Sequence, residues 1–175
     1  MKSKILLLLA VIGITFSSCD LSGEANYTPQ IYPFISPNDS LGIYRTDVLD
    51  VFRMDTITVG DTVSFYIQMT GVENNLTAFY LTQSADSAAR FILPNKSSMD
   101  SVFLSTSDYK TGKFLMNGTS TDLYFPFKYV ARKPSNEAKV TFTVVSDAKF
   151  TDSYIGTNTT TLTIKTPIVD KLVSE

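Results

Sequence analysis

The chain has 175 residues, 43% of them hydrophobic, with a formal net charge of −2, one cysteine, no histidine and no tryptophan. The lack of histidine removes the commonest general base and metal ligand, and a single cysteine excludes a cysteine-rich zinc site. A mildly acidic chain without a basic block is also a poor nucleic-acid binder, so we expect no metal, no cofactor and no nucleic-acid partner.

The first nineteen residues have the organisation of a secretory signal peptide. Lys2 and Lys4 precede an apolar run from Ile5 to Ile14, and small residues then lead to Cys19. A membrane-spanning helix needs about 20 apolar residues, so this run is too short to be one. Residues 1–18 are therefore predicted to be a signal peptide that is removed on export, and Cys19 to be the first residue of the mature chain.

The sequence Phe16-Ser17-Ser18-Cys19 resembles the lipobox of bacterial lipoproteins, in which a small residue precedes the cysteine that is lipidated. Phe16 stands where the common pattern has leucine, and Bacteroidetes-type exported lipoproteins are similar in tolerating this. The resemblance implies lipidation of Cys19 and anchoring in the outer membrane of the cell envelope, on its surface or periplasmic face. Secretion with Cys19 as a free thiol is the alternative. A disulfide-held domain would carry an even number of cysteines, so the solitary Cys19 favours lipidation.

Residues 19–38 are predicted to be the lipidated cysteine and a flexible tether. Polar and small residues dominate its first part, and Pro29, Pro33 and Pro37 then recur every four residues. This spacing is incompatible with a helix. The folded domain is accordingly predicted to span residues 39–175.

From residue 39 the pattern is that of β-strands. Strict alternation of apolar and polar residues is clearest over 63–69, 122–132 and 140–144, where it indicates strands with one buried face. Pro126 predicts an edge or a bulge in the second of these, because proline cannot donate to a sheet. Weaker signals predict further strands over 54–59, 76–82, 90–93, 101–105 and 159–166. Residues 71–75 and 112–121 are predicted to be loop or turn.

Seven or so short strands and no helix of ten residues predict an all-β fold, an immunoglobulin-like β-sandwich of about seven strands in a single domain, with a barrel as the alternative. Residues 136–142 resemble the corner between the fifth and sixth strands of immunoglobulin-like domains. Val140 stands where a corner tyrosine would be, and the core cysteine pair and tryptophan are absent. The resemblance is therefore to divergent immunoglobulin-like domains, including β-sandwich domains of uncharacterised Bacteroidetes lipoproteins whose function is unknown.

Tripeptides of Asp, Ser or Thr, and an apolar residue occur five times. They resemble the O-glycosylation motif of exported Bacteroidetes proteins, which implies glycans on Ser40, Thr56, Thr62, Ser87 and Ser101. The alternative is structural, since a turn-forming aspartate often precedes a strand that begins with a hydroxyl residue.

Two further groups have a structural and a functional interpretation. Asp39, Asp47, Asp50 and Asp55 could bind calcium, but their spacing matches no EF-hand loop, so solvated loops are the better interpretation. Most of the nine tyrosines and twelve phenylalanines are expected in the core. The tyrosines expected to be exposed, and so able to stack on a sugar, are Tyr66, Tyr109, Tyr124 and Tyr154.

No catalytic constellation stands out in this sequence. We expect a non-enzymatic binding or assembly module that contacts the membrane through its lipid and a glycan or another envelope protein through its domain. The alternative is a carboxylate-based glycan hydrolase at the cell surface. Such an enzyme needs two carboxyl groups about 5–9.5 Å apart, and a cleft with two converging acidic side chains would favour it.

Overall fold

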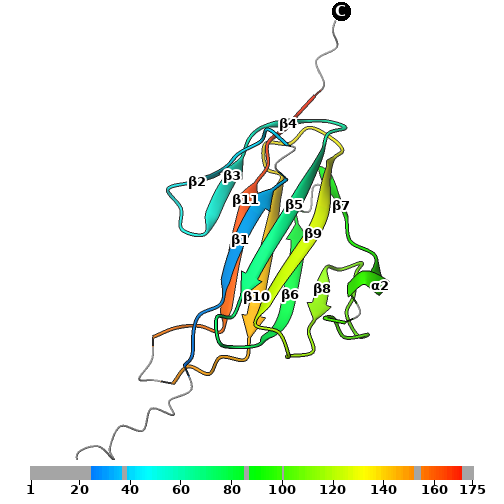
Figure 1. Ribbon diagram of the computed structural model, residues 1–175. Helices are drawn as coiled ribbons and strands as arrows, with labels where there is room; N and C mark the ends of the chain where they lie inside the picture. Colours follow the sequence, from blue (N-terminus) through cyan, green and yellow to red (C-terminus); the bar gives the residue numbers. More distant parts are fainter. Residues whose placement is uncertain (1–24, 37–38, 85–86, 100, 152–154, 171–175) are drawn as a thin grey trace, which may run out of the picture.

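A computed structural model describes residues 25–36, 39–84, 87–99, 101–151 and 155–170, which form two packed β-sheets (Figure 1). The first sheet has four strands, in the order β1 (Gln30–Ile35), β5 (Thr62–Thr70), β9 (Asp122–Ala131) and β7 (Ala89–Ile92). The second has six, in the order β2 (Ile43–Arg45), β3 (Val51–Met54), β11 (Thr159–Lys165), β10 (Lys139–Ser146), β6 (Leu76–Gln83) and β8 (Lys113–Leu115). A two-stranded piece joins β4 (Ile57–Thr58) to β12 (Ile168–Val169). The one helix in these ranges, α2 (Lys96–Met99), is too short to cross a membrane.

The strand order is that of an immunoglobulin-like domain. In such domains one sheet has the order A-B-E-D and the other contains C, F and G, and here β1-β5-β9-β7 and β6-β10-β11 take these places. Three further strands widen the second sheet: β3 pairs in parallel with β11, β2 pairs with β3, and β8 pairs with β6. The predicted all-β, immunoglobulin-like sandwich is confirmed, and the barrel alternative is not adopted.

Alternation along the strands builds the core. The inward side chains of β5 and β9 are all buried: Val63, Phe65, Ile67, Met69, Leu123, Phe125, Phe127, Tyr129 and Ala131. Leu81 on β6 and Val140 on β10 face them from the second sheet and are also buried. Each such side chain contributes about 1.5–3 kcal/mol relative to an exposed one, which explains why the most regularly alternating segments became the central strands.

An aromatic cluster connects the two sheets of a core that has no disulfide and no tryptophan. Phe79 on β6 lies with its ring centroid 5.0 Å from that of Phe125 on β9. Phe127 on β9 packs in the same way against Phe142 on β10, with centroids 5.8 Å apart. These ring contacts join the two sheets, as a tryptophan and an inter-sheet disulfide do in antibody-type domains.

The predicted tether, residues 19–38, is wrong over residues 26–35. β1 pairs with β5 over six residues, so the domain begins well before residue 39. The segment before β1 is also held: Tyr27 N–H donates to Asn74 Oδ1 at 2.9 Å, and Lys149 N–H donates to Asn26 Oδ1 at 2.6 Å. The three prolines exclude a helix, as argued from the sequence, but they do not exclude an edge strand.

The position of Pro33 explains how an edge strand tolerates it. Ser36 N–H donates to Ser64 O at 3.0 Å, in line with the β1–β5 register. Hydrogen-bonded pairs alternate along an antiparallel ladder. The backbone N–H and C=O groups of the even-numbered residues of β1 therefore point toward β5. The backbone groups of Ile31, Pro33 and Ile35 point toward the open edge. Pro33 therefore removes no ladder bond, and it deprives the open edge of one donor.

Prolines also end the pairing between β7 and β9. Arg132 N–H donates to Ala88 O at 2.7 Å, and the same register pairs Ile92 with Lys128. The next hydrogen-bonded pair would place Pro94 opposite Pro126, and neither residue has an N–H to donate. β7 stops at this point, so the first half of β9 is an edge on this side, which confirms the edge predicted at Pro126.

Three other predicted segments need correction. Residues 101–105 form turns with a single bridge, Phe103 to Met116, rather than a strand. β8 lies inside the segment 112–121 that was predicted to be turn. The strand predicted over 54–59 is divided between the end of β3 and β4. The strands in the last two corrections, β8, β3 and β4, have two to four residues each and are too short to show a period.

Candidate aromatic binding face

The outward positions of β1, β5 and β9 bring four exposed aromatic side chains together. Tyr32 and Phe34 lie on β1, Tyr66 on β5 and Tyr124 on β9, and their exposed fractions are 43%, 49%, 44% and 62%. Together with Gln68 and Pro126, they form what is called here the aromatic face. A cluster of large exposed apolar side chains marks an interaction site on a soluble domain.

The register arranges the aromatic face in two rows across three strands. One row is Phe34, Tyr66 and Pro126, which are paired in β1, β5 and β9. The other is Tyr32, Gln68 and Tyr124. Neighbouring strands lie about 4.8 Å apart and successive rows about 7 Å apart, so the rings form a compact, shallow platform.

A hollow of about 290 Å³ adjoins the first row next to Tyr66. Its wall includes Ile92, Pro94, Pro126 and Lys128. The hollow lies where the two opposed prolines end the pairing of β7 with β9 and β7 leaves the sheet. The opposed prolines thus have two effects: the Pro126 ring adds a flat surface to the platform, and the end of the β7–β9 pairing opens a recess beside it.

The outer face of the second sheet is built differently. Thr141 and Thr163 lie opposite each other with their hydroxyls 3.0 Å apart, and Thr143 and Thr161 repeat this arrangement at 3.0 Å. Threonine satisfies the preference of strands for β-branched residues at a solvated face. A solvated strand surface of this domain can thus be built from threonines, so solvent exposure alone does not explain the aromatic side chains of the first sheet.

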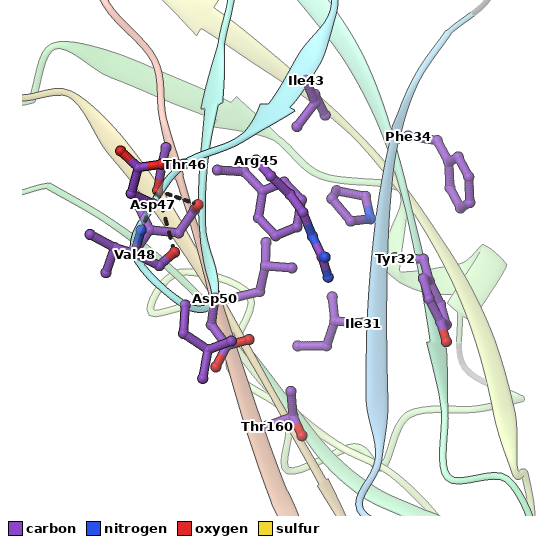
Figure 2. Close-up of a pocket in the computed structure, with 15 residues that line it drawn as sticks. Ile31, Tyr32, Phe34, Ile43, Arg45, Thr46, Asp47, Val48, Asp50 and Thr160 are labelled. Atoms are coloured by element: carbon purple, nitrogen blue, oxygen red, sulfur yellow. Dashed lines mark hydrogen bonds between the residues drawn. The ribbon is translucent and has the colours of Figure 1, made fainter.

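A second, larger recess of about 560 Å³ lies between β1 and the β2–β3 hairpin (Figure 2). Ile31, Ile43 and Leu162 line it, and the Arg45 guanidinium carbon lies 6.0 Å from the centre of the Phe52 ring. The hairpin tip is closed by the Thr46 hydroxyl, which donates to Val51 O at 2.7 Å.

Asp47 and Asp50 also line the hairpin recess and are its two carboxylates. Both are exposed, and both come from the same hairpin tip. The acid of a glycosidase is instead held in a desolvated pocket that keeps it protonated. This recess does not offer such an environment to either carboxylate.

The predicted tyrosines have different outcomes. Tyr66 and Tyr124 are exposed as predicted, and the register places them on adjacent rows of one face. Tyr109 is half-buried and packs edge-on against Phe114 with ring centroids 5.1 Å apart, so the prediction for it is wrong. Tyr154 lies outside the described residues. Tyr32 and Phe34 were missed because their segment was interpreted as tether.

The candidate modification sites are all at the surface where they are described. The hydroxyl residues Ser40, Thr56, Thr62, Ser87 and Ser101 are each exposed. Asp61, which precedes Thr62, also has a structural role, since Thr58 N–H donates to its Oδ2 at 2.8 Å. Cys19 lies outside the described residues, as do Asp86 and Asp100 of two of the tripeptides.

Two of the four aspartates weighed as a calcium site accept backbone hydrogen bonds instead. Asp55 Oδ2 accepts the N–H of Gly42 at 2.8 Å, and Asp39 Oδ2 accepts the N–H of Ser64 at 3.2 Å. Across the described ranges no three His, Cys, Asp or Glu residues are grouped so that they could hold a metal ion.

No family model and no curated protein matches the chain. Among solved structures it is similar to domains 4 and 5 of the S-layer protein SbsC, with 14% identity and a TM-score of 0.31. The match covers 79% of this chain and 54% of that one, so the chain spans about half the length of that structure.

Proposed function

We propose that this protein is a lipid-anchored component of the cell envelope whose domain binds a ligand through the aromatic face without catalysing a reaction. The observation that carries the proposal is the register of the first sheet, which gathers Tyr32, Phe34, Tyr66 and Tyr124 on one exposed surface. Covering half of an aromatic side chain removes about 100 Å² from water, worth about 2 kcal/mol per ring before the cost of association.

The anchor is supported by the sequence alone. The signal pattern ends at Cys19, and only five residues lie between Cys19 and Ala25, the first described residue. The six Cα–Cα steps from Cys19 to Ala25 span at most about 22 Å, so a lipid on Cys19 would keep the domain close to the bilayer. The segment that leads into β1 and the end of β12 lie at opposite ends of the sandwich, and β1, β5 and β9 run along its length between them (Figure 1). Such an attachment leaves the aromatic face open to ligands.

The hydrolase alternative has less support. Its requirement is a pair of carboxylates converging in a cleft. The hairpin recess offers only the exposed Asp47 and Asp50, and a recess of about 450 Å³ beside Ala25 offers only the exposed Glu73 and Asp147. The aromatic face contains no carboxylate in either row. Binding without catalysis therefore fits the described surface better.

A retention experiment tests the proposal. The purified protein is immobilised and exposed separately to soluble polysaccharides and to envelope proteins of the producing cells. We expect retention of at least one fraction, loss of that retention in the Tyr66→Ala/Tyr124→Ala double variant, and unchanged retention in Tyr44→Ala. Tyr44 is a matched control because it is 57% exposed but lies on β2, away from the face. Equal retention by the double variant would contradict the proposal.

A further inference from the structure

The first row of the aromatic face has the dimensions of a stacking track. Phe34, Tyr66 and Pro126 lie on three adjacent strands, so each is about 4.8 Å from the next. That interval is comparable to the length of one sugar ring. Two aromatic rings and a pyrrolidine ring present flat apolar surfaces, and one face of a pyranose is likewise an apolar surface of C–H groups.

The polar groups of the face suit hydroxyls rather than charges. Gln68 lies within the second row, Ser64 adjoins the first, and Gln30 accepts a hydrogen bond from the Tyr32 hydroxyl. Amide and hydroxyl groups both donate and accept hydrogen bonds, and so do sugar hydroxyls. Ligands that combine C–H faces with hydroxyl rims match this mixture.

Charged residues stand only at the margins of this described surface. Asp122 lies opposite Thr70 at one end, and Lys128 lies between Ser64 and Ile92 at the other, near Arg90. The cores of protein–protein interfaces are enriched in methionine and arginine as well as aromatic residues. Neither methionine nor arginine occurs in the two rows, which favours an uncharged, hydroxyl-rich ligand over a protein at the centre of the face.

The hollow beside Tyr66 adds a recess to the track. It continues the first row past Pro126 and is lined by both Ile92 and Pro94, with Lys128 at its rim. A recess of about 290 Å³ at the end of a flat platform suits one sugar unit at a chain end or branch. We infer that the aromatic face binds a polysaccharide chain whose sugar rings stack along Phe34, Tyr66 and Pro126 and end in this hollow. The inference rests on the proposed function and specifies its ligand.

Affinity electrophoresis with soluble polysaccharides tests the inference on the purified protein. Separate gels each contain one polysaccharide: a neutral β-glucan, a xylan, a mannan, a mucin-type glycan or a polyuronate. We expect at least one to retard the protein, and Tyr66→Ala to weaken that binding at least tenfold. Tyr66→Phe keeps the apolar ring surface and is therefore expected to keep the binding within about threefold. Tyr44→Ala is expected to migrate as the unchanged protein does.

Three results would overturn the inference. The first is normal migration of the unchanged protein in every gel. The second is retardation by the polyuronate alone that Lys128→Gln abolishes and Tyr66→Ala does not, which would show charge attraction without stacking. The third is a concentration-dependent dimer, or retention of an envelope protein but of no polysaccharide, that Tyr66→Ala disrupts. The third result leaves the aromatic face as a binding surface, so it rejects the polysaccharide while the proposed function stands.

Discussion

The Tyr129 hydroxyl lies 2.6 Å from Oγ1 of Thr166, and both side chains are buried. Tyr129 is near the end of β9 in the first sheet, and Thr166 directly follows β11 in the second. The bond therefore ties the two sheets together at the end of the sandwich where β9 turns toward β10. Immunoglobulin-like domains often have a tyrosine at this corner, on the strand after the turn. Here Val140 occupies that strand, and the tyrosine comes from the strand before it.

Removing one partner of this bond leaves the other as a buried polar group. We expect Tyr129→Phe and Thr166→Val each to lower the free energy of unfolding by about 1–3 kcal/mol, because the remaining hydroxyl loses a partner and stays desolvated. The double variant should lose less than the sum of the two single losses. Urea unfolding of the four proteins measures this, with the exposed Tyr44→Phe as control. Strict additivity would show that the two hydroxyls do not stabilise each other.

Gly112 and Gly118 allow backbone strain to be separated from steric overlap. Both have φ of +70°, but a Cβ on Gly112 would lie 2.1 Å from the Leu81 carbonyl oxygen, whereas one on Gly118 would meet nothing within 4 Å. Gly118→Ala should cost about 1–2 kcal/mol from the left-handed conformation alone. Gly112→Ala should cost clearly more, because β6 or the 108–113 turn must shift. Equal losses in chemical unfolding would mean that the turn relaxes without cost.

Pro33 is predicted to protect the open edge of β1. Restoring a donor at an outward position of an edge strand creates a site for pairing with another chain. We expect Pro33→Val to increase light scattering and self-association on concentration while changing the unfolding free energy by less than about 1 kcal/mol. Ile35→Val is the matched control, since Ile35 also faces the open edge and already has its N–H. Similar behaviour of the two variants would assign no protective role to Pro33.

The central strands could be predicted from the sequence because their side chains point alternately into the core and into solvent. Phe125 and Phe127 must face the core while Tyr124 and Lys128 face solvent, and this demand produces a visible period of two. β1 was missed because its prolines carry the opposite local signal. Whether Pro33 disrupts a strand depends on which way its nitrogen points, and that direction is set by the pairing with β5, more than thirty residues away along the chain.

Only part of the aromatic face could be predicted from the sequence. Tyr66 and Tyr124 sit at polar positions of strongly alternating strands, so their exposure could be predicted. Their proximity could not, because it depends on the register of β5 against β9.

β8 was not predicted because it has only three residues, too few to show an alternating pattern. Its turn is set locally by Asp108, which accepts the N–H groups of Lys110 at 2.9 Å and Thr111 at 3.4 Å. These hydrogen bonds, led by that of Lys110, lower the pKa of Asp108.

Cys19 is predicted to carry the lipid that holds the domain at the membrane. Cells producing the full chain are fed an alkyne analogue of palmitate, and the protein is expected to incorporate it and to sediment with the envelope. Cys19→Ser removes the only thiol of the chain, so the label should be lost and the protein should be released into soluble fractions. Two or more acyl chains hold a protein stably, which is why one substitution is expected to change the location completely. A labelled Cys19→Ser variant, or an unlabelled chain that still sediments with the membrane, would contradict lipidation at this residue. Tyr44→Ala serves as control, since it should keep both the label and the membrane location.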